Sequence, residues 1–265
     1  MLRVLVNGAD GRMGSQVVKA VYEDKELEFV GGVSVTSIGE DCGELAGIGT
    51  LGIPVREGLA KSLEDIKPDV VVDFTIPKVI FDNAKIVMEH GIHMVVGTTG
   101  LTASQRTELG KIADEHKANI FIAPNFSIGA VLMMKVSEII APYMPDAEII
   151  ELHHNNKLDA PSGTAILTAE KINDARKAAH AEAAPDKTHE SLEGARGAKV
   201  DDIPVHSVRL QGYVAHQQVL FGGYGELLTI RHDSLDRKSF MPGVILAVKK
   251  VGSHPGLTFG LENFL

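Results

Sequence analysis

The sequence predicts an α/β protein in which a parallel sheet covered by helices is joined to a smaller α+β domain with an open mixed sheet. Three observations predict this fold. Short apolar runs alternate with amphipathic segments over the first 124 residues, which is typical of strand–helix–strand units. A glycine-rich turn follows the first apolar run directly. After Pro124 the pattern changes to helix, strand, helix and three closely spaced strands, so a second domain is expected to begin there.

The first domain is expected to contain five buried strands, because five apolar runs rich in Val and Ile are bounded by Gly, Pro, Asn or Asp. These runs are residues 2–6, 28–33, 69–74, 92–96 and 119–123. Apolar residues recur at helical spacing between the runs, and the expected helices are residues 12–23, 78–90 and 102–118. Thr102 is the expected N-cap of the third helix.

The second domain is expected to begin with three elements, a helix, a strand and an Ala-rich helix, at residues 128–140, 147–154 and 163–179. Polar residues then predict a mobile loop over 180–202. Three strands follow, and the short links between them predict two hairpins; the strands are 203–210, 213–221 and 225–232, and the links are Gln211-Gly212 and Gly222-Gly223-Tyr224. A last helix, at 240–252, is expected to return to the first domain. The expected domains are therefore 1–125 with 240–265, and 126–239.

Composition excludes several classes of protein. A chain of 265 residues with 44% hydrophobic and 23% charged residues has the composition of a folded globular protein. The net charge of −9 argues against nucleic-acid binding. No apolar run reaches the length of a membrane span, and no targeting segment is visible. With Cys42 as the single cysteine, we expect a cytoplasmic protein with no internal disulfide and no thiolate zinc site.

The glycine-rich turn predicts a dinucleotide site, and with it a Rossmann-like first domain. Gly8, Gly11 and Gly14 lie between an apolar strand and an amphipathic helix, where backbone N–H groups and the helix N-terminus bind a pyrophosphate. An ordinary glycine turn is the alternative. The expected cofactor contacts in this turn are Gly8, Ala9, Asp10, Gly11, Arg12 and Met13.

The end of the second strand bears on the choice of coenzyme. An NAD-specific site places Asp or Glu there, against the ribose 2′-hydroxyl, but this chain has Ser34, Val35 and Thr36. Hydroxyl groups such as that of Thr36 can donate to a 2′-phosphate, and Arg12 can supply a nearby cation. The sequence therefore predicts that NADPH is used at least as well as NADH.

Three further motifs, DFT, GTTG and APNFS, each follow a predicted strand. They are expected at the same edge of the sheet, where open α/β sheets bind ligands. Ordinary turn chemistry is the alternative for each motif alone. Together with the glycine turn they predict cofactor contacts by Phe74, Thr75, Gly97, Thr98, Thr99, Ala123, Pro124, Asn125 and Phe126.

Residues 150–165 combine two imidazoles, an ammonium group and a predicted helix N-terminus. Such a set forms an anion pocket that also moves protons. The candidate residues are His153, His154, Lys157, Ser162, Gly163 and Thr164. The alternatives are a polar strand end, a metal site, for which the ligand spacing is missing, and a serine nucleophile, for which no nucleophile elbow exists. We expect no metal.

The motifs GxxGRMG, DFT, GTTG, APNFS and ELHHxxKxDAPSGTA, in this order, resemble the dihydrodipicolinate reductase family, also called 4-hydroxy-tetrahydrodipicolinate reductases. The resemblance implies reduction of 4-hydroxy-tetrahydrodipicolinate with NADH or NADPH, in lysine and diaminopimelate biosynthesis, by a homotetramer. It implies that His153 donates and accepts a proton, that Lys157 donates one, and that His154, Gly163 and Thr164 bind the dicarboxylate substrate. Arg237 is a further anion contact or an exposed charge. The chain departs from many members at Val35 and Thr36, and from some at Ile76.

Two other functions remain open from the sequence. One is another Rossmann-type oxidoreductase that uses NAD(P), such as a semialdehyde dehydrogenase, for which Cys42 would have to be the nucleophile. The other is a non-catalytic regulator that binds NAD(P). The cofactor motifs and the His-His-Lys segment lie in different predicted domains, and hydride transfer requires reacting atoms about 3–3.5 Å apart. Bending is therefore expected near Asn125 and Ser239.

Overall fold

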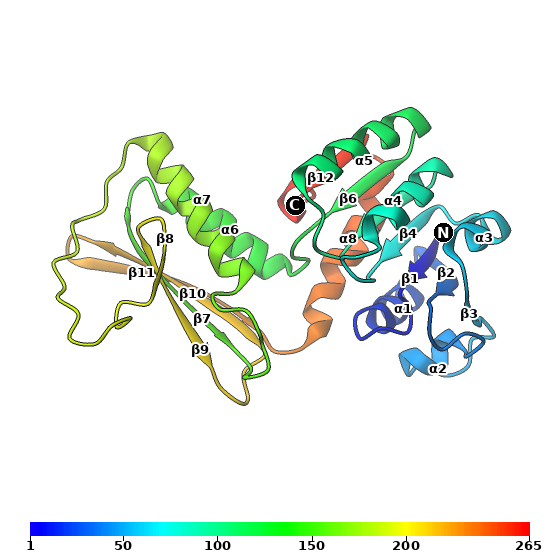
Figure 1. Ribbon diagram of the computed structural model, residues 1–265, viewed down its shortest axis with the longest axis horizontal. Coiled ribbons are helices and arrows are strands. Elements are labelled where there is room, and N and C mark those ends of the chain that lie inside the picture. The colour runs from blue at the N-terminus through cyan, green and yellow to red at the C-terminus, as the bar shows by residue number, and fades with distance from the viewer. The chain divides into compact units, whose positions relative to one another are not determined.

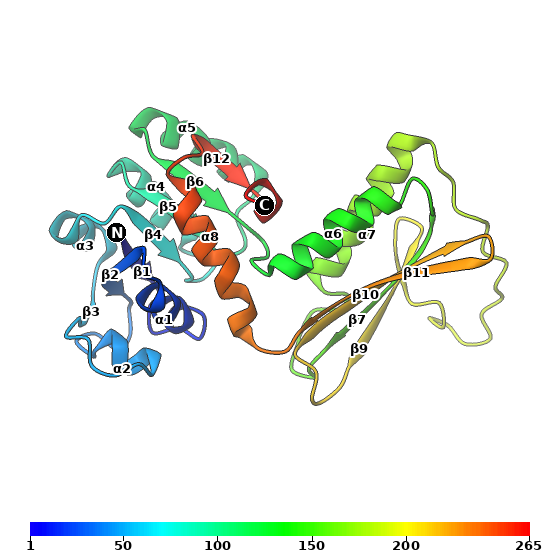
Figure 2. The ribbon, with the colours of Figure 1, turned by 180° about the vertical axis from the view of Figure 1, so that it is seen from behind.

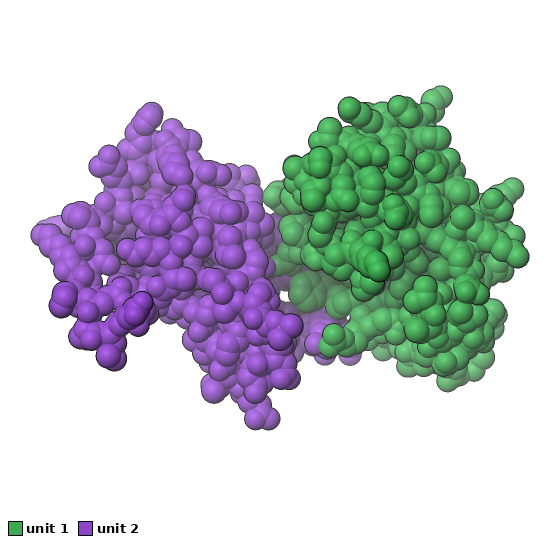
Figure 3. All heavy atoms as spheres, viewed as in Figure 1, with its two compact units in different colours: residues 1–126, 240–265 green, residues 127–239 purple.

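The computed structural model describes all residues, 1–265, and the chain forms two compact units (Figure 3). Unit 1 comprises residues 1–126 and 240–265, and unit 2 comprises residues 127–239. The domain boundaries expected from the sequence lie within one residue of these limits. No helix in the structure has the length and apolar character that crossing a membrane requires.

Unit 1 is built on a seven-stranded sheet in the order β12-β6-β5-β4-β1-β2-β3, and every neighbouring pair is parallel. Near-continuous Val and Ile runs form its central strands because both faces of the sheet are buried. The strands are β1 (Leu2–Asn7), β2 (Leu27–Val33), β3 (Val55–Arg56), β4 (Val70–Asp73), β5 (His93–Val96), β6 (Asn119–Ile122) and β12 (Gly256–Phe259).

Helices cover both faces of this sheet (Figures 1 and 2). One face carries α1 (Gly14–Glu23) and α8 (Met241–Val251), and the other carries α3 (Leu59–Ile66), α4 (Ile80–Glu89) and α5 (Ala103–His116). A short helix, α2 (Cys42–Ala46), lies between β2 and β3 in the chain. The strand order is that of a doubly wound sheet, and the turn after β1 lies where the order reverses, between β1 and β4.

The five strands and three helices expected in the first part of the chain are present, with limits that differ by one or two residues. Thr102 caps α5 as expected, and its side chain forms a capping box with Gln105. Four further elements of unit 1, α2, β3, α3 and β12, were not predicted from the sequence. These elements have two to eight residues, too few for a periodic pattern to stand out.

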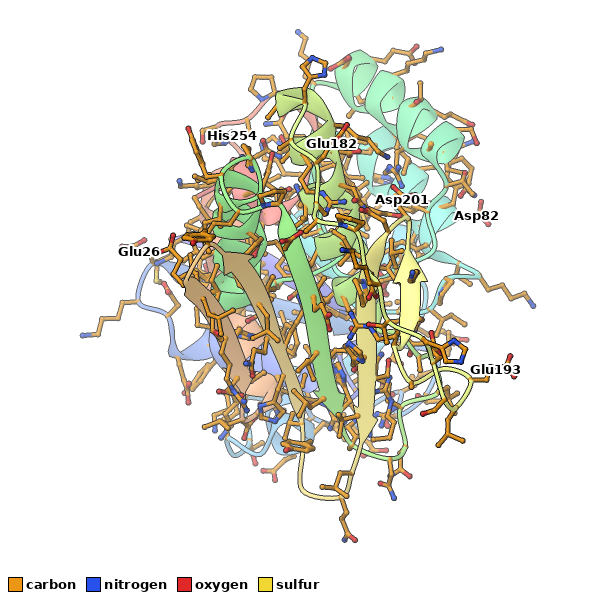
Figure 4. All side chains as sticks on the ribbon, turned by 90° about the vertical axis from the view of Figure 1, so that its left-hand side faces the viewer. Glu26, Asp82, Glu182, Glu193, Asp201 and His254 are labelled. Atoms are coloured by element: carbon orange, nitrogen blue, oxygen red, sulfur yellow. The ribbon has the colours of Figure 1, made fainter.

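Unit 2 contains a five-stranded mixed sheet in the order β11-β10-β7-β9-β8. Helices α6 (Ile128–Ile140) and α7 (Gly163–Ala179) lie on one face (Figure 1), where their apolar residues and those of the strands form one core. The strands are β7 (Asp146–His153), β8 (Ala198–Val200), β9 (Ile203–Arg209), β10 (Ala215–Gly223) and β11 (Glu226–Ser234). Figure 4 looks onto the other face of this sheet, which these two helices leave uncovered.

Two expectations for this sheet were wrong. β9 and β10 do not form a hairpin, because β7 lies between them, parallel to β9 and antiparallel to β10. The link between β9 and β10 only has to cross one strand, roughly 10 Å, which five residues span easily. Residues 198–200 form strand β8 within the expected loop 180–202. The second hairpin is confirmed: β10 pairs with β11 around Tyr224-Gly225.

Candidate active site

The glycine turn of unit 1 has a backbone that only glycine allows. Gly8 has a φ of +82°, and a Cβ atom there would lie 2.6 Å from the carbonyl oxygen of Phe74. A Cβ atom on Gly14, the first residue of α1, would lie 1.8 Å from the carbonyl oxygen of Gly8. The turn therefore folds tightly between β1 and α1 and brings the helix N-terminus against the sheet. This geometry fits a pyrophosphate, which needs bare backbone and a helix N-terminus.

The motifs after β4, β5 and β6 lie with the glycine turn at one edge of the sheet, as expected. The strand register places Asn7 beside Asp73, Asp73 beside Val96 and Val96 beside Ile122. The residues that follow these four strand ends are the sequence-predicted contacts Gly8 to Met13, Phe74, Thr75, Gly97, Thr98, Thr99, Ala123, Pro124, Asn125 and Phe126. Of these, Arg12, Thr99 and Pro124 are exposed. Thr36 is also exposed, after the end of β2.

Asp73 organises two of these loops. Its carboxylate is fully buried and accepts hydrogen bonds from the backbone N–H and hydroxyl of Thr75 at 3.0 and 2.7 Å, and from the hydroxyl of Thr98 at 2.8 Å. The side-chain amides of Asn7 and Asn83 donate to its other oxygen at 2.8 and 3.1 Å. One carboxylate thus fixes the positions of the DFT and GTTG motifs relative to β1 and α4.

Aromatic rings pack around the GTTG motif. A Cβ atom on Gly97 would lie 2.2 Å from the ring of Phe74, so the glycine lets this ring pack directly on the backbone. The rings of Phe74 and Phe126 have centroids 5.8 Å apart, and that of Phe126 lies 5.9 Å from Phe121. In the structure, the ring of Phe74 packs against the bare backbone of Gly97, and both residues are among the cofactor contacts expected from the sequence.

The main cluster in unit 2 begins with Glu151, whose side chain is fully buried near the end of β7. Alternation along the strand places Glu151 and His153 on the same face. His153 Nδ1 lies 2.5 Å from Glu151 Oε2, and Arg209 on the neighbouring strand donates to both carboxylate oxygens at 2.8 Å. Burial opposes ionisation of Glu151, but the hydrogen bonds from His153 and Arg209 outweigh it and lower its pKa from 4.5 to about 2. Because an ionised carboxylate only accepts, His153 Nδ1 carries the proton.

Lys157 and His154 lie next to this pair in the loop after β7. The ammonium group of Lys157 forms an ion pair with Asp159 at 2.7 Å and keeps about a fifth of its side-chain surface exposed. This hydrogen bond lowers the pKa of Asp159. His154 Nδ1 is buried and has no hydrogen-bond partner in the structure. A buried imidazole nitrogen without a partner is costly, which is typical of a group that meets a ligand.

Helix α7 begins beside Glu151 and completes the cluster. Ser162 is its N-cap: the hydroxyl accepts from the backbone N–H of Ala165 at 3.2 Å, and its own N–H donates to Glu151 at 3.2 Å. Ser162 is buried and thus serves the helix, whereas Gly163 is exposed and Thr164 half-buried in the first turn. The strand register puts His153, Ala215 and Ser234 in one row, so Arg237 lies at the same end of the sheet, with an exposed side chain.

Cys42 has the properties of a core residue. Its side chain is buried at the start of α2, and burial together with the neighbouring Asp41 raises the pKa of the thiol to about 11. A thiol in this state is not a nucleophile near neutral pH. The structure therefore disfavours an enzyme that depends on a catalytic cysteine.

A cavity of about 780 Å³ lies at the opposite end of the unit 2 sheet from His153. It is lined by the start of β7 and by residues 183–186, which belong to the segment before β8. Glu193, further along this segment, projects away from the sheet (Figure 4). The cavity shares no residue with the His153 cluster.

Three residues that organise the two clusters were not among the predicted site residues: Asp73 in unit 1, and Glu151 and Arg209 in unit 2. Two of them had a visible signal. Asp73 is a carboxylate that ends an otherwise apolar strand, and Glu151 interrupts an apolar strand two residues before His153, so each needs a buried partner. Arg209 had none, because the strand β9 that carries it was expected to pair with β10.

Fold and site together define a dinucleotide-binding oxidoreductase, in which a doubly wound sheet is combined with a second sheet that carries proton-transferring and cationic side chains. Residues 2–126 match the N-terminal domain of dihydrodipicolinate reductase, and residues 129–265 match its C-terminal domain. The chain belongs to the dihydrodipicolinate reductase family.

Individual relatives agree with this assignment over the full length. The chain is 50% identical to the 4-hydroxy-tetrahydrodipicolinate reductase of Listeria monocytogenes serotype 4b, and the match covers all of both chains. It is 46% identical to the enzyme of the same name from Desulfitobacterium hafniense, over 100% of this chain and 98% of that one. Among solved structures, the dipicolinate-bound dihydrodipicolinate reductase from Paenisporosarcina sp. TG-14 superposes with a TM-score of 0.89, at 43% identity over 100% of both chains.

Proposed function

We propose that the protein reduces 4-hydroxy-tetrahydrodipicolinate to tetrahydrodipicolinate with NADPH or NADH, in lysine and diaminopimelate biosynthesis. The observation that carries the proposal is the cluster at the end of β7, where His153 is held by a buried carboxylate beside Lys157 and the N-terminus of α7. A relative that is 43% identical to this chain carries bound dipicolinate, which is consistent with a dicarboxylate substrate.

The first unit offers the residues that hold the coenzyme. Gly8 to Met13 would hold the pyrophosphate, and the loops fixed by Asp73 lie at the same edge of the sheet. The bound dinucleotide supplies a hydride to the substrate. Thr98, which is bonded to Asp73, and the packed ring of Phe74 keep these loops in a fixed position for binding.

The second unit handles protons and negative charge. The overall change takes up one hydride and one proton and releases the 4-hydroxyl group as water. With the proton of His153 held on Nδ1 by Glu151, Nε2 is the atom that exchanges a proton, a role that contributes about 10²–10⁴-fold to a rate. Once the ammonium group of Lys157 leaves Asp159, it pairs with one substrate carboxylate and donates a proton to the substrate. Gly163 and Thr164 hold a carboxylate at the start of α7, next to His154.

Arg237 is proposed as a further anion contact, since it lies at the same end of the sheet. Ser162 supports the site through its cap and its bond to Glu151 rather than through the substrate. We place the reaction in the cytoplasm, where reduced nicotinamide coenzymes are available.

We propose that the uncovered face of the unit 2 sheet assembles the protein into a homotetramer. On this face Leu227 is 84% exposed, and Leu220 is only half-buried on the neighbouring strand. An apolar sheet face of this kind is normally covered. Light scattering coupled to size-exclusion chromatography is expected to give four times the 28.4 kDa of the chain. A monomer would refute this part of the proposal.

Coenzyme oxidation followed by absorbance tests the activity. NADPH or NADH is incubated with the protein and with the product of the synthase that forms 4-hydroxy-tetrahydrodipicolinate. We expect rapid oxidation that depends on this product and is absent when it is omitted. Oxidation without the product, or none with it for either coenzyme, would refute the function. A semialdehyde dehydrogenase would instead require the buried thiol of Cys42.

A further inference from the structure

A carboxylate lies at the end of β2, although the sequence has no acidic residue there. Ser34 Oγ donates to Asp10 Oδ1 at 2.6 Å, and the hydroxyl of Thr36 donates to Oδ2. The backbone N–H of Thr36 in turn donates to Ser34 Oγ at 3.2 Å. Both hydroxyls at the strand end therefore point at a residue of the glycine turn.

The topology of the sheet explains this placement. β1 and β2 are parallel neighbours, with Asn7 beside Val33. The N–H groups of Gly8 and Ala9 both donate to the carbonyl of Val33, at 2.8 and 3.2 Å. The turn after β1 is thus bonded to the last residue of β2. Asp10, three residues beyond β1, comes to lie beside the first residues after β2.

This is the place where dinucleotide-binding sheets hold an acidic residue against the adenosine ribose. A carboxylate there accepts a hydrogen bond from the 2′-hydroxyl of NADH and is close to the 2′-phosphate of NADPH. A carboxylate has about four acceptor positions, and those of Asp10 are shared among the hydroxyls of Ser34, Thr36 and Ser37 and a backbone N–H, which together outweigh burial and lower its pKa. Ser34 and Thr36, which the sequence analysis offered as donors to a phosphate, already donate to Asp10.

We propose that Asp10 determines coenzyme specificity: it accepts the ribose 2′-hydroxyl of NADH and repels the 2′-phosphate of NADPH. The protein accordingly prefers NADH, contrary to the expectation from the sequence alone. The kinetic part of this inference rests on the proposed function. The binding of NAD⁺ and NADP⁺ tests it independently of that function. Arg12 is exposed two residues further along the turn and is the cation that meets a 2′-phosphate when Asp10 is neutralised.

Binding of NAD⁺ and NADP⁺, measured by titration calorimetry, tests this directly. The unaltered protein is expected to bind NAD⁺ at least tenfold more tightly than NADP⁺. Asp10→Asn removes the charge at nearly constant shape, and we expect the NAD⁺/NADP⁺ affinity ratio to fall by tenfold or more. Thr36→Val removes one of the hydroxyl donors that hold Asp10, and a smaller fall in the same direction is expected.

Glu40→Gln is the matched control. Glu40 is an exposed acid in the segment after β2, and its neutralisation changes the net charge by the same amount without touching Asp10. We expect its affinity ratio to stay within twofold of the unaltered protein. Tighter binding of NADP⁺ by the unaltered protein, or an unchanged ratio in Asp10→Asn, would overturn the proposal.

The same variants separate this proposal from the proposed function. The specificity constants kcat/KM for NADH and NADPH are expected to follow the affinity ratio when the substrate is reduced. If the affinity ratio shifts as expected but neither coenzyme reduces the substrate, the role of Asp10 stands and the proposed reaction fails. If the substrate is reduced but the ratio does not shift, the reverse holds.

Discussion

His153 Nδ1 and Glu151 Oε2 lie 2.5 Å apart on the same face of β7, and Arg209 binds both oxygens of the same buried carboxylate. The imidazole is therefore held in one tautomer and one orientation by a carboxylate that is itself fixed by Arg209. A carboxylate that fixes the tautomer and orientation of an imidazole serves proton transfer in the same way in the Ser-His-Asp triad.

Replacement of Glu151 by Gln is expected to lower kcat by about tenfold to a hundredfold, with a smaller change in KM, because proton transfer through His153 loses its oriented and charged partner. Steady-state kinetics and the pH dependence of kcat measure this. Glu148→Gln is the control: Glu148 lies on the same strand, on the opposite face, and bonds to Arg196 and His206. Equal losses in both variants would argue for a purely structural role of Glu151.

The lowered pKa of Glu151 predicts how the stability of the protein changes in acid. Its pKa is lowered from 4.5 to about 2 in the folded protein, so its stabilising contribution is complete above pH 4.5 and is lost as the pH falls towards 2. In Glu151→Gln, the free energy of unfolding should decline less steeply over this window, by up to about 1.4 kcal/mol per pH unit. Urea unfolding at pH 4.5 and 3.5 gives the comparison. Parallel declines in the two proteins would contradict the assigned pKa.

Lys157→Ala is expected to reduce kcat by about 10²–10⁴-fold, since it removes a proton donor and a carboxylate partner. Coenzyme affinity should stay nearly constant, because Lys157 belongs to unit 2 and the coenzyme loops to unit 1. Lys177→Ala serves as the comparison, since Lys177 forms an exposed ion pair with Asp201 in the last turn of α7. Unchanged turnover in Lys157→Ala would remove this residue from the mechanism.

Asp73→Asn is expected to destabilise the protein by about 1–3 kcal/mol or more, because an amide group turns a donor towards Thr75, Thr98 or Asn7 in a buried position. The same change should weaken dinucleotide binding, since two loops lose their common anchor. Thermal unfolding and coenzyme titration measure the two effects. Asp69→Asn is the control. Asp69 is exposed at the other end of β4 and accepts from the backbone N–H of Arg3, and the amide oxygen of Asn can accept the same bond. Stability and dinucleotide affinity should therefore change little.

Much of the molecule followed from local patterns in the chain. The parallel strands of unit 1 could be predicted because buried strands are continuously apolar. Thr102 could be predicted as the N-cap of α5 because capping is a local interaction. The hairpin at Tyr224-Gly225 was predicted for the same reason, with its turn one residue later than expected. The partners of Glu151 and Asp73 were not predictable in this way. Arg209 is 58 residues from Glu151, and Thr98 is 25 residues from Asp73.

The sequence by itself determined the doubly wound first unit, the motif positions at its strand ends and the family, because each depends on residue types at short spacings. The tertiary structure alone decided that β7 separates β9 from β10, that Arg209 meets Glu151, and that Asp10 reaches the end of β2. These contacts arise from strand order and register. Strand order depends on which strands pack side by side in the folded sheet. The side-chain pattern of one strand shows which of its faces is buried, but it does not show which strand lies next to it.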